Sequence, residues 1–166
     1  MGKKHPWFDC VWDFKYYKKG KLIWQESTKN ALADEGEEAM LETFFRADAV
    51  YTPTTFYMRL CNDTLAETDT LSSILNEPVG NGYIAQEIQR SAAGFPTKVL
   101  HEGDYRLISK EITYTANGGQ IGPINTAFLA TSSDNSKKLI SYVPTSIVRT
   151  ILDGDSMTAN IRIKLS

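Results

Sequence analysis

The stretch Ser156-Met157-Thr158-Ala159-Asn160-Ile161-Arg162-Ile163-Lys164-Leu165 decides the fold class of this chain. Polar and apolar residues alternate through it without a break. This is the period of a β-strand that buries one face and exposes the other, and a helix does not produce it. Just before it, Asp153-Gly154-Asp155 predicts a tight turn in which Gly154 takes a positive φ. We therefore expect a long strand over residues 156–165 that starts from this turn.

Further β segments occupy the chain after Pro53. The expected strands cover residues 54–60, 82–89, 104–115, 125–131, 137–143 and 147–152. Turn sequences rich in Gly, Pro, Asn and Ser separate them. Strands at such short intervals, without helices to make parallel crossovers, favour a mainly β protein. We expect an antiparallel β-sandwich of jelly-roll or Ig-like type and not a parallel α/β fold.

A β-hairpin with an aromatic face is expected over residues 11–25. Trp12, Phe14 and Tyr16 alternate with other residues up to the turn at Lys19-Gly20. This face is too apolar to remain in water. It must therefore lie against the rest of its own domain or against a neighbouring subunit.

One helix is predicted in the first half of the chain, over residues 34–46. Asp34 can cap its first turn, and Glu37 can reach back to complete a capping box. A single apolar stripe follows at helical spacing, formed by Met40, Leu41, Phe44 and Phe45. Such a stripe needs a partner surface, and a sheet face would serve.

The length and composition of the chain fit one folded domain with an arm. Its 166 residues are 42% hydrophobic and 23% charged, which supplies a core and excludes a disordered tail. We divide it into an amino-terminal arm with the aromatic hairpin at residues 1–30 and a single β-sandwich domain with its helix at residues 31–166. A formal charge of −2 provides no bulk positive field to attract nucleic acid or anionic lipid.

Neither a signal peptide nor a membrane span is expected. The basic residues 1–7 are followed by a stretch that charges interrupt, and no apolar run approaches the roughly 18 residues that a bilayer requires. Cys10 and Cys61 lie far apart and lack zinc-site spacing, so we expect free thiols, with Cys61 in the core. These features indicate a protein made in a cytoplasm.

Residues that could perform chemistry are few. A triad of His101, Asp104 and Ser109 can be written, but any β protein rich in Ser and Asp yields one, and a solvated loop histidine is the favoured interpretation. The acidic loop at residues 62–77 could bind a hard cation weakly, although a solvated loop is favoured there too. We therefore expect no catalytic residue, no metal ligand, no cofactor and no enzymatic activity.

The order of segments after residue 54 carries a resemblance. The segments are residues 55–60, 82–91, 112–116, 122–130 and 139–142, followed by the turn Gly154-Asp155-Ser156-Met157-Thr158. This order resembles small β-rich virion structural proteins of tailed bacteriophages, in which a similar Gly-Asp-Ser/Thr turn starts the final strand. Residues 30–37 are similar to the helix entry of some of them. The resemblance implies a head, tail or fibre component and supplies no catalytic residue.

The leading hypothesis is a capsid decoration or cement protein that is located in the virion and stabilises the head shell through protein–protein contacts. Its expected partners are copies of itself in a closed symmetry such as a trimer, and other virion proteins such as the major capsid protein. No specific nucleic acid and no membrane are expected as partners. The side chains expected at these interfaces are Trp7, Trp12, Phe14, Tyr16, Trp24, Leu71, Ile74 and Leu75.

Two alternative functions stay open at this point. In the first, the protein is a tail or fibre component, and exposed aromatic side chains such as Tyr17 and Trp24 stack on the sugar rings of host-surface carbohydrate. In the second, which has the least support, it is a hydrolase built around His101.

Overall fold

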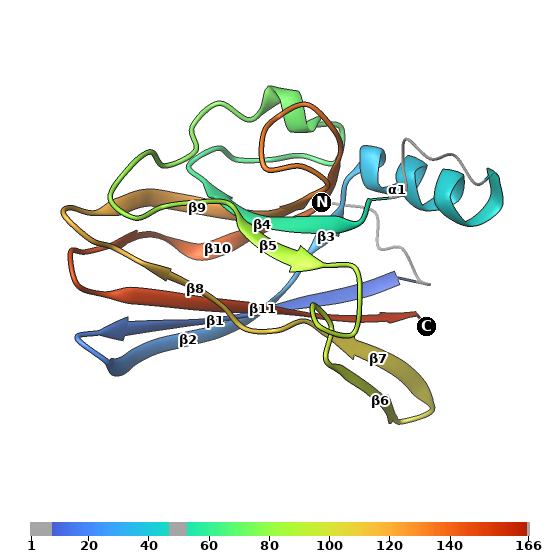
Figure 1. Ribbon diagram of the computed structural model, residues 1–166, viewed down its shortest axis with the longest axis horizontal. Helices are drawn as coiled ribbons and strands as arrows, with labels where there is room; N and C mark the ends of the chain where they lie inside the picture. Colours follow the sequence, from blue (N-terminus) through green and yellow to red (C-terminus); the bar gives the residue numbers. More distant parts are fainter. Residues whose placement is uncertain (1–7, 47–52, 166) are drawn as a thin grey trace.

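A computed structural model describes residues 8–46 and 53–165, which form two antiparallel sheets packed face to face (Figure 1). Sheet A contains β1 (Phe8–Lys18), β2 (Lys21–Lys29), β6 (Thr97–His101), β7 (Asp104–Ile108), β8 (Ile112–Thr115) and β11 (Ser156–Leu165). Sheet B contains β3 (Ala31–Leu32), β4 (Thr55–Cys61), β5 (Gln86–Gln89), β9 (Ile121–Ala130) and β10 (Leu139–Ile151). The predicted antiparallel β-sandwich is confirmed.

The alternating stretch at residues 156–165 forms β11, the central strand of sheet A. The order of strands is β2-β1-β11-β7-β6, and β8 pairs with the part of β11 that β7 leaves free. Met157, Ala159 and Ile161 point into the core and are buried. Gly154 has a φ of +79° in the turn before the strand, as predicted. The longest alternating run of the sequence therefore becomes the strand that organises this sheet.

The aromatic hairpin is part of the sandwich. Its turn residues Lys19 and Gly20 both have positive φ, at 47° and 79°, which is the type I′ turn that suits the twist of a two-residue hairpin. β1 lies between β2 and β11, and its aromatic side chains enter the core that the two sheets share. This corrects the expected division at residue 30, because a hairpin that supplies an inner strand of sheet A is not a separate unit.

The predicted helix begins as α1 (Asp34–Leu41) and continues as a π-helical turn, η1 (Glu42–Arg46). The capping prediction is wrong: Ala33 is the N-cap residue, and no side chain caps it. The helix instead approaches β10 through Gly36, where an added Cβ would lie 2.1 Å from the carbonyl oxygen of Ile140. None of the helices in the described part of the chain is long and apolar enough to cross a bilayer.

Several strand predictions differ from the structure. The segment 82–89 is a strand only in its second half, as β5. The segment 104–115 is broken at Ser109-Lys110 into β7 and β8, which pair with different parts of β11. The segments 137–143 and 147–152 belong to one strand, β10, whose register with β9 shifts after Pro144. The strand β6 was not predicted, because all five of its residues are exposed and so show no alternation between apolar and polar positions.

Sheet B is covered on both faces. Its inner face packs on sheet A, while Phe128 and Leu139 belong to a second apolar cluster on the opposite face. Residues 62–81 lie over that face, where the short 3₁₀ helix η2 (Leu71–Ser73) places Leu71 and Ile74 in the cluster. The long polar excursion therefore serves as a third layer of the fold.

Candidate interaction surfaces

The aromatic residues of β1 are core residues. Trp12 and Phe14 are 0% exposed and Tyr16 is 6% exposed, and the hydroxyl of Tyr16 donates to the Asp155 carboxylate at 2.9 Å. Their assignment to a partner interface is corrected. The alternation in the sequence correctly predicted that this face is buried, but sheet B of the same chain buries it, and not a partner. Trp7 lies outside the described residues.

The other predicted interface residues separate into two groups. Leu71 and Ile74 are buried in the cluster on sheet B, which corrects their assignment, whereas the neighbouring Leu75 is 81% exposed. Trp24 is half-buried, and the guanidinium of Arg149 lies 4.0 Å from the centre of its ring. The side of Trp24 that faces Arg149 is therefore occupied and cannot stack on a sugar.

The hairpin of β6 and β7 carries an uncovered apolar face. Leu107 pairs with Ile163 of β11, so its side chain lies on the face of sheet A that forms the core, together with Tyr105 and Leu100. These three residues are 40%, 67% and 58% exposed, in that order. The core-facing side of sheet A thus continues into this hairpin beyond the region that the rest of the chain covers.

A second uncovered apolar group lies on the helix. Leu41, Phe44 and Phe45 are 55%, 78% and 82% exposed. This corrects the expectation that the whole stripe packs on a sheet face. α1 meets β10 through its small residues Gly36 and Ala39, Met40 is half-buried, and the other three residues of the stripe are exposed.

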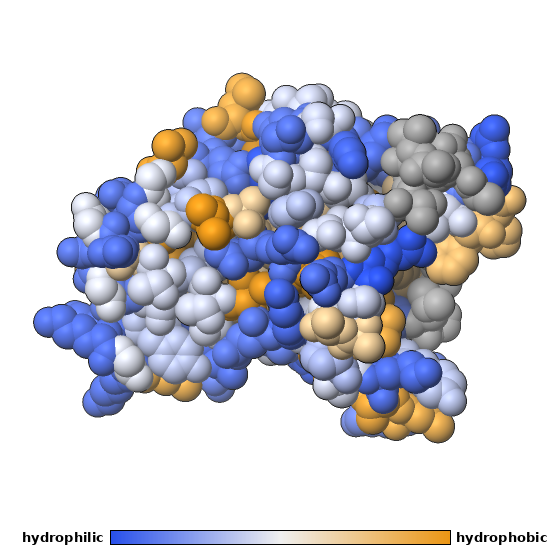
Figure 2. Space-filling view, viewed as in Figure 1, coloured by the Kyte–Doolittle hydropathy of each residue, from blue (hydrophilic) through white to orange (hydrophobic). Residues whose placement is uncertain are grey.

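Both groups lie toward the same end of the long axis of the molecule (Figure 1). Figure 2 shows apolar side chains at the tip of the projecting hairpin and at the outer end of the helix. We call these residues the apolar end; they are Leu41, Phe44, Phe45, Leu100, Tyr105 and Leu107.

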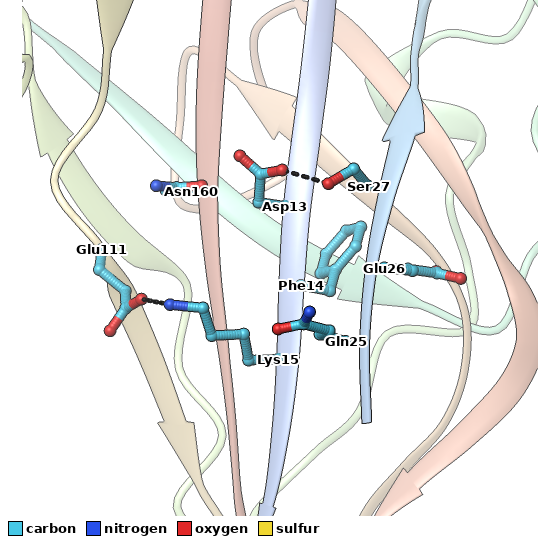
Figure 3. A pocket seen from close by; sticks show the side chains of 8 residues that line it. All are labelled: Asp13, Phe14, Lys15, Gln25, Glu26, Ser27, Glu111 and Asn160. Atoms are coloured by element: carbon cyan, nitrogen blue, oxygen red, sulfur yellow. Dashed lines mark hydrogen bonds and ion pairs between the residues drawn. The ribbon is translucent and has the colours of Figure 1, made fainter. Parts of the chain in front are cut away.

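A polar pocket of about 390 Å³ lies on sheet A (Figure 3). Its lining residues are Asp13, Phe14, Lys15, Gln25, Glu26, Ser27, Glu111 and Asn160. Arg162 donates to both carboxylate oxygens of Asp13 at 2.7 Å, and Lys15 lies 3.3 Å from Glu111, so several of its charges are already paired. The Oδ1 atom of Asn160 is buried without a hydrogen-bond partner. The pocket therefore suits a neutral polar ligand better than an ion.

The residues of the possible triad are not assembled for catalysis. His101 and Asp104 face each other beside the turn of the β6–β7 hairpin. Ser109 follows the other end of β7. Five residues of extended strand separate it from Asp104, which corresponds to about 16 Å. Its buried hydroxyl donates to the Lys110 carbonyl and accepts from the Ile161 amide. Ser109 therefore has a structural role, joining the loop between β7 and β8 to β11.

The cysteines and the acidic loop are also engaged in structure. Both Cys10 and Cys61 are free and buried, and burial raises the pKa of Cys61 to about 12, so this thiol stays protonated at neutral pH. Asp63 accepts hydrogen bonds from the amides of Leu75 and Asn76 at 3.2 and 2.8 Å. Within residues 8–46 and 53–165, no group of three or more His, Cys, Asp or Glu side chains is placed to hold a metal ion.

A buried polar network that was not predicted from the sequence lies under residues 62–81. Arg59 of β4 is 3% exposed, and its guanidinium pairs with the Glu77 carboxylate, which also accepts from the hydroxyl of Tyr83. Burial, the nearby Tyr114 ring and Glu77 raise the pKa of Tyr83, so its hydroxyl remains a donor. An arginine inside an apolar strand was the available signal, since a buried charge requires a partner.

No protein-family model matches this chain, and no curated protein matches it in sequence. Its function is therefore inferred from the surfaces described above and from the segment order of its sequence.

Proposed function

We propose that this protein is a non-enzymatic structural subunit of a virion, a decoration or cement protein that stabilises a capsid shell through protein–protein contacts. The virion part of the proposal rests on the order of strands and turns that resembles small β-rich proteins of tailed bacteriophages. The contact part rests on the apolar end, and this is the observation that carries the proposal.

The apolar end has the properties of a contact surface. Large apolar side chains cost free energy in water at roughly 25 cal/mol per Å² of apolar area, and a group of them on one end of a soluble protein marks an interaction site. Tyr105 and the phenylalanines are also the residue types that dominate binding energy in interfaces. Because Leu100, Tyr105 and Leu107 lie on paired strands, they are held in place before a partner arrives.

Such a subunit would act through interface area alone. A shell under internal pressure gains strength when an added subunit bridges neighbouring capsomers. Specific interfaces bury roughly 1,000 Å² or more in total, which the apolar end together with its polar surroundings could supply in a multivalent shell. No chemical step is needed for this function.

Imaging of virus particles with and without this subunit tests the proposal. We expect a missing layer of density on the head shell of particles that lack it, and lower resistance of those heads to heat or osmotic shock. The variant Tyr105→Asp should fail to restore the layer, because a charge at the contact is costly to desolvate. Val79→Asp, at a residue that is 91% exposed and outside the apolar end, is the matched control and should restore it. Unchanged heads in the absence of the subunit would refute the proposal.

The polar pocket favours a second candidate, a tail or fibre component that binds host-surface carbohydrate. Sugars present many neutral hydroxyl groups, and the exposed Gln25 amide in the pocket offers matching hydrogen bonds. Titration of the full chain with host polysaccharide should then give binding that Gln25→Ala abolishes. Val79→Ala is the control. Absence of binding across the polysaccharides of the host would count against this candidate.

A further inference from the structure

The strand β6 presents a free edge at the apolar end. It is the last strand in the order of sheet A, and within the described chain only β7 pairs with it. Glu102 and Gly103 both have positive φ, at 54° and 88°, so the β6–β7 turn is type I′ and its flanking residues form a hydrogen-bonded pair. Hydrogen-bonded and non-hydrogen-bonded pairs alternate along the two strands from this turn. The backbone amides and carbonyls of Lys98 and Leu100 therefore point away from β7. These four backbone groups are available to another strand.

We propose that a second copy of this chain pairs with this edge, β6 against β6 and antiparallel, about a two-fold axis that passes midway between the two Val99 residues. The proposal deepens the proposed function, because it rests on the hairpin as an interface and names its first partner. It gives a two-fold pair in place of the trimer expected from the sequence.

The edge is complementary to itself in this register. With Val99 opposite Val99 of the second copy, Leu100 lies opposite Lys98 of the second copy, and the reverse pair is equivalent by symmetry. Each of these two pairs exchanges two N–H···O=C bonds, so all four free backbone groups on each strand are used. In a register shifted by one residue, the outward amides and carbonyls of one β6 would face residues of the other β6 whose amides and carbonyls already bond to β7. No hydrogen bonds would then form between the two copies.

The charges of the edge are compatible with this pairing. A lysine on an edge strand often prevents self-association because like charges meet. In this register Lys98 lies opposite Leu100 of the second copy, and its two diagonal neighbours are the acidic Glu102 and the like-charged Lys98 of the second copy. The lysine side chain is long and can carry its ammonium group to the solvent while its stem covers Leu100.

Pairing would also join the uncovered apolar faces. Leu100, Tyr105 and Leu107 lie on the same face of the hairpin, and the two-fold axis places the same three residues beside them. Two narrow faces thus become one wider face, on which the two Lys98 side chains lie at the seam between the apolar residues. The pair would then offer a shell a symmetric contact of twice the width.

Disulfide trapping of the full chain tests the pairing. In the proposed register the Cβ atoms at position 99 of the two copies lie about 5 Å apart, close to disulfide geometry, whereas those at position 97 lie about 13 Å apart. Under mild oxidation with glutathione disulfide, Val99→Cys should form a covalent dimer at least about tenfold faster than Thr97→Cys. The native Cys10 and Cys61 are 2% and 0% exposed and should not interfere.

A proline variant checks that strand pairing causes the trapping. The amide of Leu100 points to the free edge, so Leu100→Pro removes an outward donor without removing a bond to β7. We expect Val99→Cys/Leu100→Pro to lose the fast cross-link while keeping the thermal midpoint of Val99→Cys. Equal cross-linking rates at positions 97 and 99, or a trimeric mass by sedimentation, would overturn the pairing.

The two proposals can fail separately. If Val99→Cys does not cross-link but Tyr105→Asp still prevents attachment to heads, only the pairing is wrong. If Val99→Cys cross-links as expected but heads are unaffected by loss of the subunit, the pairing stands and the proposed function is wrong.

Discussion

Arg59 is a single residue that holds two loops to sheet B. Its guanidinium pairs with Glu77 of the 62–81 segment, donates to the Asp134 carbonyl at 2.8 Å and donates to the Asn135 amide oxygen at 2.8 Å. It also lies 5.1 Å from the centre of the Phe128 ring. A charge this deeply buried is stable only with all of its partners present, so removal of one partner should be costly.

Replacing Glu77 with alanine should therefore destabilise the protein strongly. We expect a loss of roughly 3 kcal/mol in the free energy of unfolding, because Arg59 is left buried without its counter-charge. Urea denaturation measures this difference. The control Glu87→Ala, at an exposed position on β5, should change stability by less than about 0.5 kcal/mol. Equal effects of the two substitutions would show that the network does not stabilise the fold.

Asp63 should make the stability of the 62–81 segment depend on pH. Partial burial raises the pKa of its carboxyl, but hydrogen bonds from Asn76 and Leu75 outweigh this, and the net pKa is lowered. A lowered pKa in the folded state means that the stabilisation is complete above the unfolded value of about 3.9 and is lost as the pH falls through the folded pKa. Wild type should thus exceed Asp63→Asn in stability at pH 7, and the difference should shrink below about pH 4. A difference that stays constant from pH 7 to pH 3 would contradict this role.

For single residues, the sequence predicts the conformation correctly where it depends only on neighbouring residues in the chain. Gly154 needs only its own turn, and Lys19-Gly20 only its own hairpin. The sequence predicted that Trp12 is buried but not which surface buries it. Alternation shows that one face of a strand is covered and does not identify the surface that covers it. The pairing of Arg59 with Glu77 depends on a contact between distant segments, and local pattern does not contain it.

Among the elements, α1 shows how a helix start can mislead. The acids Asp34, Glu35 and Glu37 do occupy its first turn, where they favour the positive end of the helix dipole. The side chain that anchors this helix start is Glu35 and not Asp34. The Glu35 carboxylate accepts hydrogen bonds from the backbone amides of Leu71 and Leu139 at 2.9 and 2.8 Å. Docking to β10 and η2 thus determines where the helix begins.

Gly36→Ala should displace α1 from sheet B. The new methyl group would lie 2.1 Å from the Ile140 carbonyl oxygen, and backbone atoms cannot move aside cheaply. We expect about 2 kcal/mol of destabilisation, measured by thermal or urea unfolding. The comparison is Gly118→Ala, where φ is +80° and nothing lies within 4 Å, so only backbone strain of about 1 kcal/mol is expected. A neutral or stabilising Gly36→Ala would show that α1 does not pack closely here.

The strand β6, on which the proposed pairing depends, was the hardest element to predict. β6 is exposed on both faces, so its sequence has neither the alternation of a half-buried strand nor the apolar run of a buried one. By contrast, β11 and β1 have one clearly buried face, and both were predicted. A strand that is exposed on both faces therefore carries less signal in its own sequence than a half-buried one.

At the scale of the whole molecule, the sandwich was predictable but its apolar end was not. Short strands with frequent turns predict two packed antiparallel sheets. Which apolar residues remain uncovered depends on where the second sheet stops, and this is a property of the assembled fold. Leu107 and Ile163 lie side by side on one face, yet only Ile163 packs against the core.

Hydrogen exchange of the full chain, free and attached to virus heads, tests the central claim most directly. The amides of Lys98 and Leu100 have no strand partner within their own chain on the outer side of β6, and they should exchange quickly at protein concentrations too low for two copies to pair. On attachment, we predict that exchange slows in residues 41–46 and 97–108, which contain the apolar end, and changes little elsewhere. Protection confined to the polar pocket around residues 25–27 and 158–160, or no protection at all, would contradict the account.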